Sequence, residues 1–190
     1  MTGTAGAERC ALLLRAVNVS GTGRVPMAEL RSLLAERTEL QSVSTYIASG
    51  NIICEVDGDH AAACAEVRML IAERFGVDTP VILRTHDQLV AALAANPFPD
   101  AALDKMVHVM FLEDAAAPGA VEQLTPRLQP GERAALIGPD LWIDYGDGGV
   151  ASTKLTKGVL DRALGTAGTA RNLNTLRKLI ELTAPADAGT

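Results

Sequence analysis

The residues best suited to hold an anion lie just before two predicted helices. Lys154 precedes the first of them, and Arg171 and Asn172 precede the second. A helix N-terminus carries unpaired backbone N–H groups and a partial positive charge, so a cation beside it favours a phosphate or carboxylate. Asn172 is also a good N-cap residue, with Thr175 three residues further on. The opposing interpretation is ordinary solvated charge beside ordinary helix caps.

Arg15 and Asn18 lie at the end of an apolar run that predicts a buried strand. An arginine in that place can bind an anion through two parallel hydrogen bonds, with the asparagine orienting the same group. The alternative is structural: Arg15 pairs with a carboxylate and Asn18 caps the following turn. The sequence leaves both interpretations open.

A third set of polar residues surrounds Ser49-Gly50-Asn51, which separates two runs of alternating residues and predicts a tight turn between strands. In the functional interpretation Asn51 donates to a ligand beside Ser49, and Tyr46 presents its hydroxyl at the same edge. In the structural one these are turn residues and a half-buried strand tyrosine. The candidate ligand-binding residues are therefore Arg15, Asn18, Tyr46, Ser49, Asn51, Lys154, Arg171 and Asn172.

Hydrophobic periodicity predicts the elements that position these residues. In the first half we expect strands at 10–17, 43–47, 52–56 and 80–84, and helices from about Pro26, over 60–75 and over 85–95. In the second half we expect strands at 106–112, 133–137 and 141–145, an extended piece at 169–170, and helices over 119–124, 155–164 and 173–182. Each half approximates β-α-β-β-α-β.

The predicted fold class is α+β, with two ferredoxin-like (β-α-β-β-α-β) subdomains in tandem and an extra C-terminal helix. We place the subdomains at residues 10–96 and 105–183, with flexible tails at 1–9 and 184–190. The composition, 48% hydrophobic and 21% charged, is that of a globular chain. Only 3% of the residues are aromatic, which disfavours the stacking of bases or sugars.

Charge and targeting signals narrow the function classes. The net charge of −6 argues against a general nucleic-acid binder. The segment from Ser152 to Lys178, however, contains six basic residues and one acidic residue. Its net charge is +5, so the remainder of the chain carries −11. No apolar run approaches the roughly 20 residues of a membrane span, and residues 1–9 lack an apolar signal-peptide core. We expect a cytoplasmic location without membrane contact; oligomeric state is unknown at this level.

The cysteines and histidines indicate no metal site or cofactor. The chain has three cysteines, Cys10, Cys54 and Cys64, and they form no CxxC pair. Apolar neighbours surround each of them, so we expect reduced, packed thiols. The three histidines are far apart in the sequence and have no Glu or Cys at a ligand spacing. We expect no metal, and the sequence identifies no catalytic residue.

Three stretches carry a resemblance to a known family. Residues 12–19 and 27–30 resemble L-L-R-G-[IV]-N-V followed by M-x-x-L; residues 45–53 resemble T-Y-[IL]-x-S-G-N-V-V; residues 153–156 and 169–175 resemble S-K-L-T-N and T-x-R-N-W-x-T. In this order they are similar to the bacterial domain-of-unknown-function family 1697. The resemblance implies paired ferredoxin-like subdomains and no assigned activity. Ala16 departs from the usual glycine, which puts a positive φ there in doubt, and Leu173 replaces a common tryptophan.

Three hypotheses follow. The first is a protein that binds a small anionic ligand, its candidate residues converging in a cleft between the subdomains. The second is an enzyme acting on such a ligand, which additionally needs a titratable residue with a perturbed pKa in that cleft. The third is a nucleic-acid or protein interaction module, in which the +5 segment forms an open face and binding falls steeply with salt.

Overall fold

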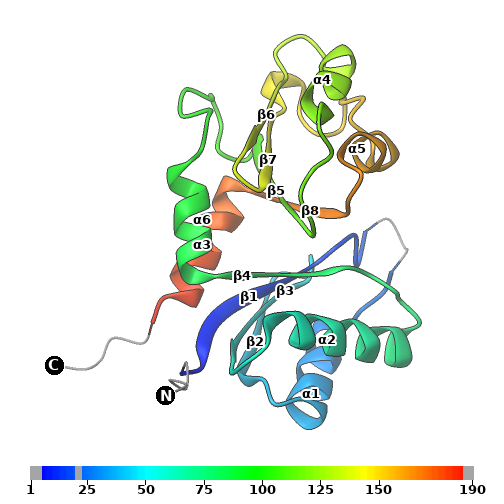
Figure 1. Ribbon diagram of the computed structural model, residues 1–190, viewed down its shortest axis with the longest axis vertical. Helices are drawn as coiled ribbons and strands as arrows, with labels where there is room; N and C mark the ends of the chain where they lie inside the picture. Colours follow the sequence, from blue (N-terminus) through cyan, green and yellow to red (C-terminus); the bar gives the residue numbers. More distant parts are fainter. Residues whose placement is uncertain (1–5, 20–22, 186–190) are drawn as a thin grey trace, which may run out of the picture. The chain divides into compact units, whose positions relative to one another are not determined.

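The computed structural model describes residues 6–19 and 23–185, and its chain divides into two compact units. One unit runs to Leu89 and resumes at Leu179, and the other spans Val90–Lys178. Figure 1 shows the elements in sequence colours. Those of the first unit are β1 (Glu8–Leu14), α1 (Met27–Arg37), β2 (Gln41–Tyr46), β3 (Asn51–Val56), α2 (His60–Phe75) and β4 (Val81–Thr85).

The first unit is built on an antiparallel sheet with strand order β2-β3-β1-β4. Successive side chains of a strand point to opposite faces, so one face of β1 carries Cys10, Leu12 and Leu14, and all three are fully buried. This face packs in one core with α1 and α2, which contribute Leu30 and Ile71 among others. The opposite face is also apolar, with Ala11 and Leu13 on β1.

The helix boundaries follow from local chemistry. Asp59 caps α2 by accepting from the backbone N–H of Ala61 at 2.8 Å, and Gly76 ends it in the left-handed conformation with φ 67°. The next helix, α3 (His86–Ala94), starts at a capping box formed by Thr85 and Gln88. The Thr85 N–H donates to Gln88 Oε1 at 3.0 Å, and the Gln88 N–H donates to Thr85 Oγ1 at 3.3 Å.

The second unit repeats the architecture of the first. Its elements are β5 (Val107–Leu112), α4 (Ala120–Leu124), β6 (Arg133–Ile137), β7 (Asp140–Asp144), α5 (Lys157–Leu164) and β8 (Gly168–Asn172). Its antiparallel sheet has strand order β6-β7-β5-β8, with Leu141 and Ile143 of β7 packed in one core with Leu160 of α5. The terminal helix is α6 (Leu173–Thr183). The boundaries between the two units fall inside α3 and α6.

Within the described residues the protein is therefore a mixed α+β fold with two four-stranded antiparallel sheets and six α-helices, which confirms the predicted class. The helix over 60–75 and the strand over 133–137 were located to the residue, and the other boundaries moved by a few positions. The predicted tails fall largely outside the described residues, although β1 already begins at Glu8. No helix in the described part of the chain is long and apolar enough to cross a membrane.

Candidate functional site

Asn18 holds together the loops at one end of the first sheet. Its carboxamide N–H₂ donates to the carbonyl oxygens of Val25 at 2.9 Å and Ala48 at 2.8 Å. Its oxygen accepts from the Val25 N–H at 2.9 Å. One side chain thus joins the segment after β1, the segment before α1 and the β2–β3 turn. This geometry is that of a loop clamp, and a ligand contact by Asn18 stays a prediction.

The β2–β3 turn is secured from inside by Asn51, which is fully buried. Its carboxamide donates to the Tyr46 carbonyl at 3.0 Å and to Ser49 Oγ at 3.1 Å. Arg15 is tied through its backbone, because Thr79 Oγ1 donates to the Arg15 carbonyl at 2.7 Å and accepts from its N–H at 3.2 Å. The turn and loop residues singled out from the sequence therefore gather at one end of this sheet, largely through bonds to backbone.

Positive backbone φ angles concentrate in the same loops. Among the described non-glycine residues, Ala16 (51°), Asn18 (56°) and Ile47 (48°) adopt them here, and the remaining one is Ser42 at a bulge in β2. Such angles are uncommon, and a β-branched residue such as Ile47 is an outlier. The position of Ala16 requires a positive φ even though glycine is absent. Conformations of this kind persist where surrounding contacts impose them, and they cluster at ligand-binding sites.

A hollow of about 500 Å³ opens beside these loops, and we call it the α1 hollow. It is lined by Asn18, by Arg24 to Met27 with Arg31, and by Thr45, Ile47 and Ala48. Arg31 lies in the second turn of α1 and donates through Nη1 to Thr45 Oγ1 at 2.6 Å. Arg24 is exposed and has no hydrogen bond or ion pair to the rest of the described chain.

The N-terminus of α1 at the α1 hollow has no side-chain cap. Pro26 occupies the N-cap position and offers no side-chain acceptor, so the first backbone N–H groups of the helix lack that partner. The sequence reasoning had placed Pro26 at the first helical position and had not selected Arg24 or Arg31. The available signal was an arginine two residues before a proline at a helix start, with another arginine one turn into the helix.

The candidate binding residues of the second unit, Lys154, Arg171 and Asn172, differ in burial and in their hydrogen-bond partners, although the sequence placed all of them beside helix N-termini. Lys154 is exposed and lies before Thr156, whose side chain caps α5 by accepting from the Val159 N–H at 3.4 Å. Asn172 caps α6 as predicted, accepting from the Thr175 N–H at 2.9 Å. Their binding roles stay predictions.

Arg171 is a buried strand residue, only 6% exposed. Its Nη1 donates to Thr169 Oγ1 at 2.7 Å and to the Ala170 carbonyl at 2.8 Å. Burial lowers the pKa of this guanidinium to about 10, which leaves it charged at neutral pH. Arg177, in the same basic segment, pairs with Asp104 at 2.8 Å. Part of the +5 charge is therefore engaged within the protein.

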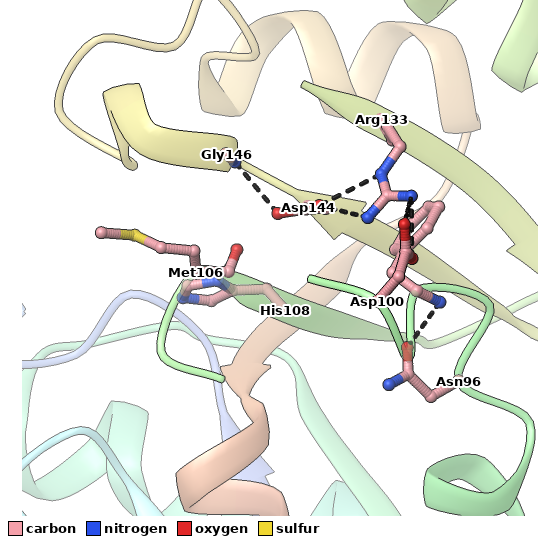
Figure 2. Close-up of polar contacts among 8 residues, drawn as sticks. Asn96, Asp100, Met106, His108, Arg133, Asp144 and Gly146 are labelled. Atoms are coloured by element: carbon pink, nitrogen blue, oxygen red, sulfur yellow. Dashed lines mark hydrogen bonds and ion pairs between the residues drawn. The ribbon is translucent and has the colours of Figure 1, made fainter. Parts of the chain in front are cut away.

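A polar network anchors the start of β6 to the end of β7 in the second unit (Figure 2). Arg133 donates to Asp144 Oδ2 through Nε at 3.1 Å and Nη2 at 2.7 Å, and Nη1 reaches both oxygens of Asp100 at 3.0 Å. Asp144 also accepts from the Gly146 N–H at 3.0 Å. The guanidinium lies 4.6 Å from the centre of the Phe98 ring. This network holds β6, β7 and the segment before β5 together, so we assign it a structural role.

His108 near this network gives the protein a titratable group that resists protonation. Burial lowers its pKa more than the contact of Nδ1 with the Met106 carbonyl, 3.4 Å away, raises it. As pH falls from about 7 to about 5, the unfolded chain takes up a proton that the native state resists, so the free energy of unfolding falls. We expect His108→Gln to make that dependence shallower, by at most about 1.4 kcal/mol per pH unit. Urea unfolding at a series of pH values measures it.

Leu136→Ala is the control for the His108 prediction, because it removes a non-titrating, 38% exposed side chain of the same unit and leaves His108 in place. The control should keep the wild-type pH dependence. A His108→Gln protein with an unchanged dependence would contradict the lowered pKa of His108.

Comparison with known proteins places the chain in a family. The sequence profile of the family described as "Protein of unknown function (DUF1697)" matches residues 7–142, which is more than half of the chain. The chain belongs to this family. The match covers the whole α1 hollow and the strands around it, and the resemblance found in the sequence motifs is confirmed. Membership assigns no activity.

One solved structure with a similar fold is described as "The structure of conserved bacterial protein SP0830 from Streptococcus pneumoniae". The two are 23% identical in sequence, with a TM-score of 0.72 over 94% of this chain and 99% of that one. At this identity the likeness supports the fold alone. Comparison with curated proteins gave no match.

Proposed function

We propose that this protein binds a small organic anion, carrying a phosphate or carboxylate group, in the α1 hollow. The observation that carries the proposal is the meeting of Arg24 and Arg31 at an uncapped helix N-terminus in a hollow of about 500 Å³. Guanidinium groups match the oxygen geometry of phosphate and carboxylate, and helix N–H groups add donors that point the same way.

The remaining lining residues suit the carbon skeleton of such a ligand. Val25, Met27 and Ile47 supply apolar surface, and Ile47 is 50% exposed. Small-molecule sites typically combine apolar walls with a few convergent polar groups, and the volume lies in their usual range of about 300–1,000 Å³. The Asn18 clamp supports the proposal indirectly, since it holds three of the lining segments in one arrangement.

Binding is favoured over catalysis by the composition of the α1 hollow. The titratable side chains in its described lining are two arginines, a residue type that does not serve as a general base. The most strongly shifted pKa values belong elsewhere. The hydrogen bond with Cys54 and burial raise the pKa of Cys10, and burial and the charge of Glu132 raise that of Tyr145 to about 12. Neither residue lines the hollow.

Several finer expectations remain proposals beside this one. We propose that both units are ferredoxin-like, because each has the order β-α-β-β-α-β and the two sheets share one strand order. We also propose a cytoplasmic location, which is supported by the three free cysteines, Cys10, Cys54 and Cys64. A shared cleft that adds Lys154, Arg171 and Asn172 to the site stays a prediction.

Thermal-shift titrations with pyrophosphate, adenosine monophosphate and citrate test the binding proposal. We expect at least one of these anions to raise the melting temperature. Arg24→Ala and Arg31→Ala should each weaken its apparent affinity by about tenfold or more, since a hydrogen bond to a charged group contributes about 1.5–3 kcal/mol.

Arg37→Ala is the matched control, because Arg37 is an exposed arginine of the last turn of α1. It should leave the affinity unchanged. A second comparison uses Lys154→Ala, which removes an exposed cation of the second unit without touching the α1 hollow. If Lys154→Ala abolishes binding while Arg24→Ala and Arg31→Ala do not, the site lies elsewhere and the proposal is wrong.

A further inference from the structure

Two buried thiols face each other across the central strands of the first sheet. Cys10 of β1 and Cys54 of β3 are direct partners in the antiparallel register, and their Sγ atoms are 3.9 Å apart. Both side chains are fully buried, on the face of the sheet that packs against α1 and α2. Neither thiol lines the α1 hollow, so this pair is independent of the proposed binding site.

The Cα spacing expected for this pair falls within the range of disulfides. The Leu14 N–H donates to the Gly50 carbonyl at 2.8 Å, which makes 14 and 50 a hydrogen-bonded pair of the ladder. Because such pairs alternate along antiparallel strands, Cys10 and Cys54 are one too, with Cα atoms about 5.5 Å apart. That separation lies in the range of disulfides, about 4.4–6.8 Å. Closing the bond must also draw the two Cβ atoms together, because directly opposite residues have Cβ atoms about 4.5–5.5 Å apart and disulfides about 3.5–4.5 Å.

We propose that Cys10 and Cys54 form a reversible cross-strand disulfide when the protein meets a peroxide, and that this bond locks β1 to β3. The third cysteine of the chain, Cys64, lies on α2.

The chemistry balances with hydrogen peroxide as the oxidant. One thiolate attacks a peroxide oxygen, the O–O bond breaks, and hydroxide leaves to give a sulfenic acid. The second sulfur then attacks the sulfenic sulfur, the S–S bond forms, the S–O bond breaks, and the oxygen leaves as water. Overall, two thiols lose two electrons and two protons, and one peroxide is reduced to two waters.

Burial makes this oxidation slow and the product durable. The hydrogen bond with Cys54, and then burial, raise the pKa of the Cys10 thiol, so the reactive thiolate is scarce. Cys10 lies near the start of β1, and strand ends open more readily than strand centres, which gives a small oxidant access. The same burial shields the disulfide from bulky thiol reductants.

The test uses Cys64→Ser protein, in which Cys10 and Cys54 are the remaining cysteines. After exposure to a series of hydrogen peroxide concentrations, the protein is unfolded without reductant and alkylated. Its intact mass is then measured by mass spectrometry. We expect a monomer lighter by two hydrogen atoms, without alkylation, that regains both thiols with dithiothreitol. Closing a loop of this length should also raise the melting temperature by at least about 5 °C.

The double variant Cys54→Ala, Cys64→Ser leaves Cys10 alone and is the matched control. It should show neither the mass loss nor the peroxide-dependent rise in melting temperature. The proposal is overturned if both thiols of Cys64→Ser remain open to alkylation at every peroxide concentration. It is equally overturned if the two sulfurs gain oxygen without cross-linking, or if the cross-linked species is a dimer.

Discussion

Gly50→Ala is expected to lower the free energy of unfolding by about 3–4 kcal/mol, because alanine meets two penalties at that position. Gly50 has φ 78°, where an L side chain is strained. A Cβ there would also lie 2.6 Å from Val17 Cγ2 and 2.7 Å from Leu14 Cβ, far inside van der Waals contact. Urea unfolding followed by far-UV circular dichroism measures the change.

Gly58→Ala separates the two penalties. Gly58 has φ 92° but no heavy atom within 4 Å of the added Cβ, so it bears the backbone strain without the clash. We expect a cost of about 1–2 kcal/mol there. Equal costs at the two glycines would show that the turn before β3 does not pack against Leu14 and Val17 as described, and the walls of the α1 hollow would need revision.

Trp142→Ala should produce the largest loss among core substitutions, about 3–5 kcal/mol. Trp142 is the chain's one tryptophan, is fully buried, and sits in β7 with Val109 of β5 and Ala135 of β6 as register partners. Removing it leaves a cavity that rigid strands on both sides cannot close. Circular dichroism is the appropriate probe, since the substitution removes the fluorophore.

Leu136→Ala provides the control on the neighbouring strand. Leu136 is a large apolar residue of β6 that is 38% exposed, so we expect its loss to cost less than about 1 kcal/mol. A Trp142→Ala protein that loses no more than Leu136→Ala would contradict the placement of Trp142 in the core of the second sheet.

Local signals explain why so much of the fold was predictable. The α2 helix was located to the residue because its apolar residues recur at helical spacing and Gly76 terminates it, and neither signal depends on the rest of the chain. The capping box of Thr85 and Gln88 marked the start of α3 in the same way. Alternation of apolar residues located the strands. Strand order involves distant pairings, and it became visible only in the structure.

The candidate site was less predictable, because the roles of polar residues depend on three-dimensional neighbours. Asn18 and Asn51 look the same in sequence whether they bind a ligand or backbone, and the structure shows both of them bonded to backbone carbonyls. Arg171 reads as a surface cation beside a helix, yet its position in β8 buries it. Arg24 and Arg31 were missed because the α1 hollow brings them to residues of the β2–β3 turn.

Backbone amide NMR spectra during a titration with pyrophosphate test the central claim most directly, because they report the location of binding as well as its occurrence. The account predicts shifts concentrated in Arg24 to Arg31 and Thr45 to Ala48, absent from the Arg24→Ala protein. Shifts confined to the N-termini of α5 and α6, or shifts in wild-type protein that Arg24→Ala leaves unchanged, would contradict anion binding in the α1 hollow.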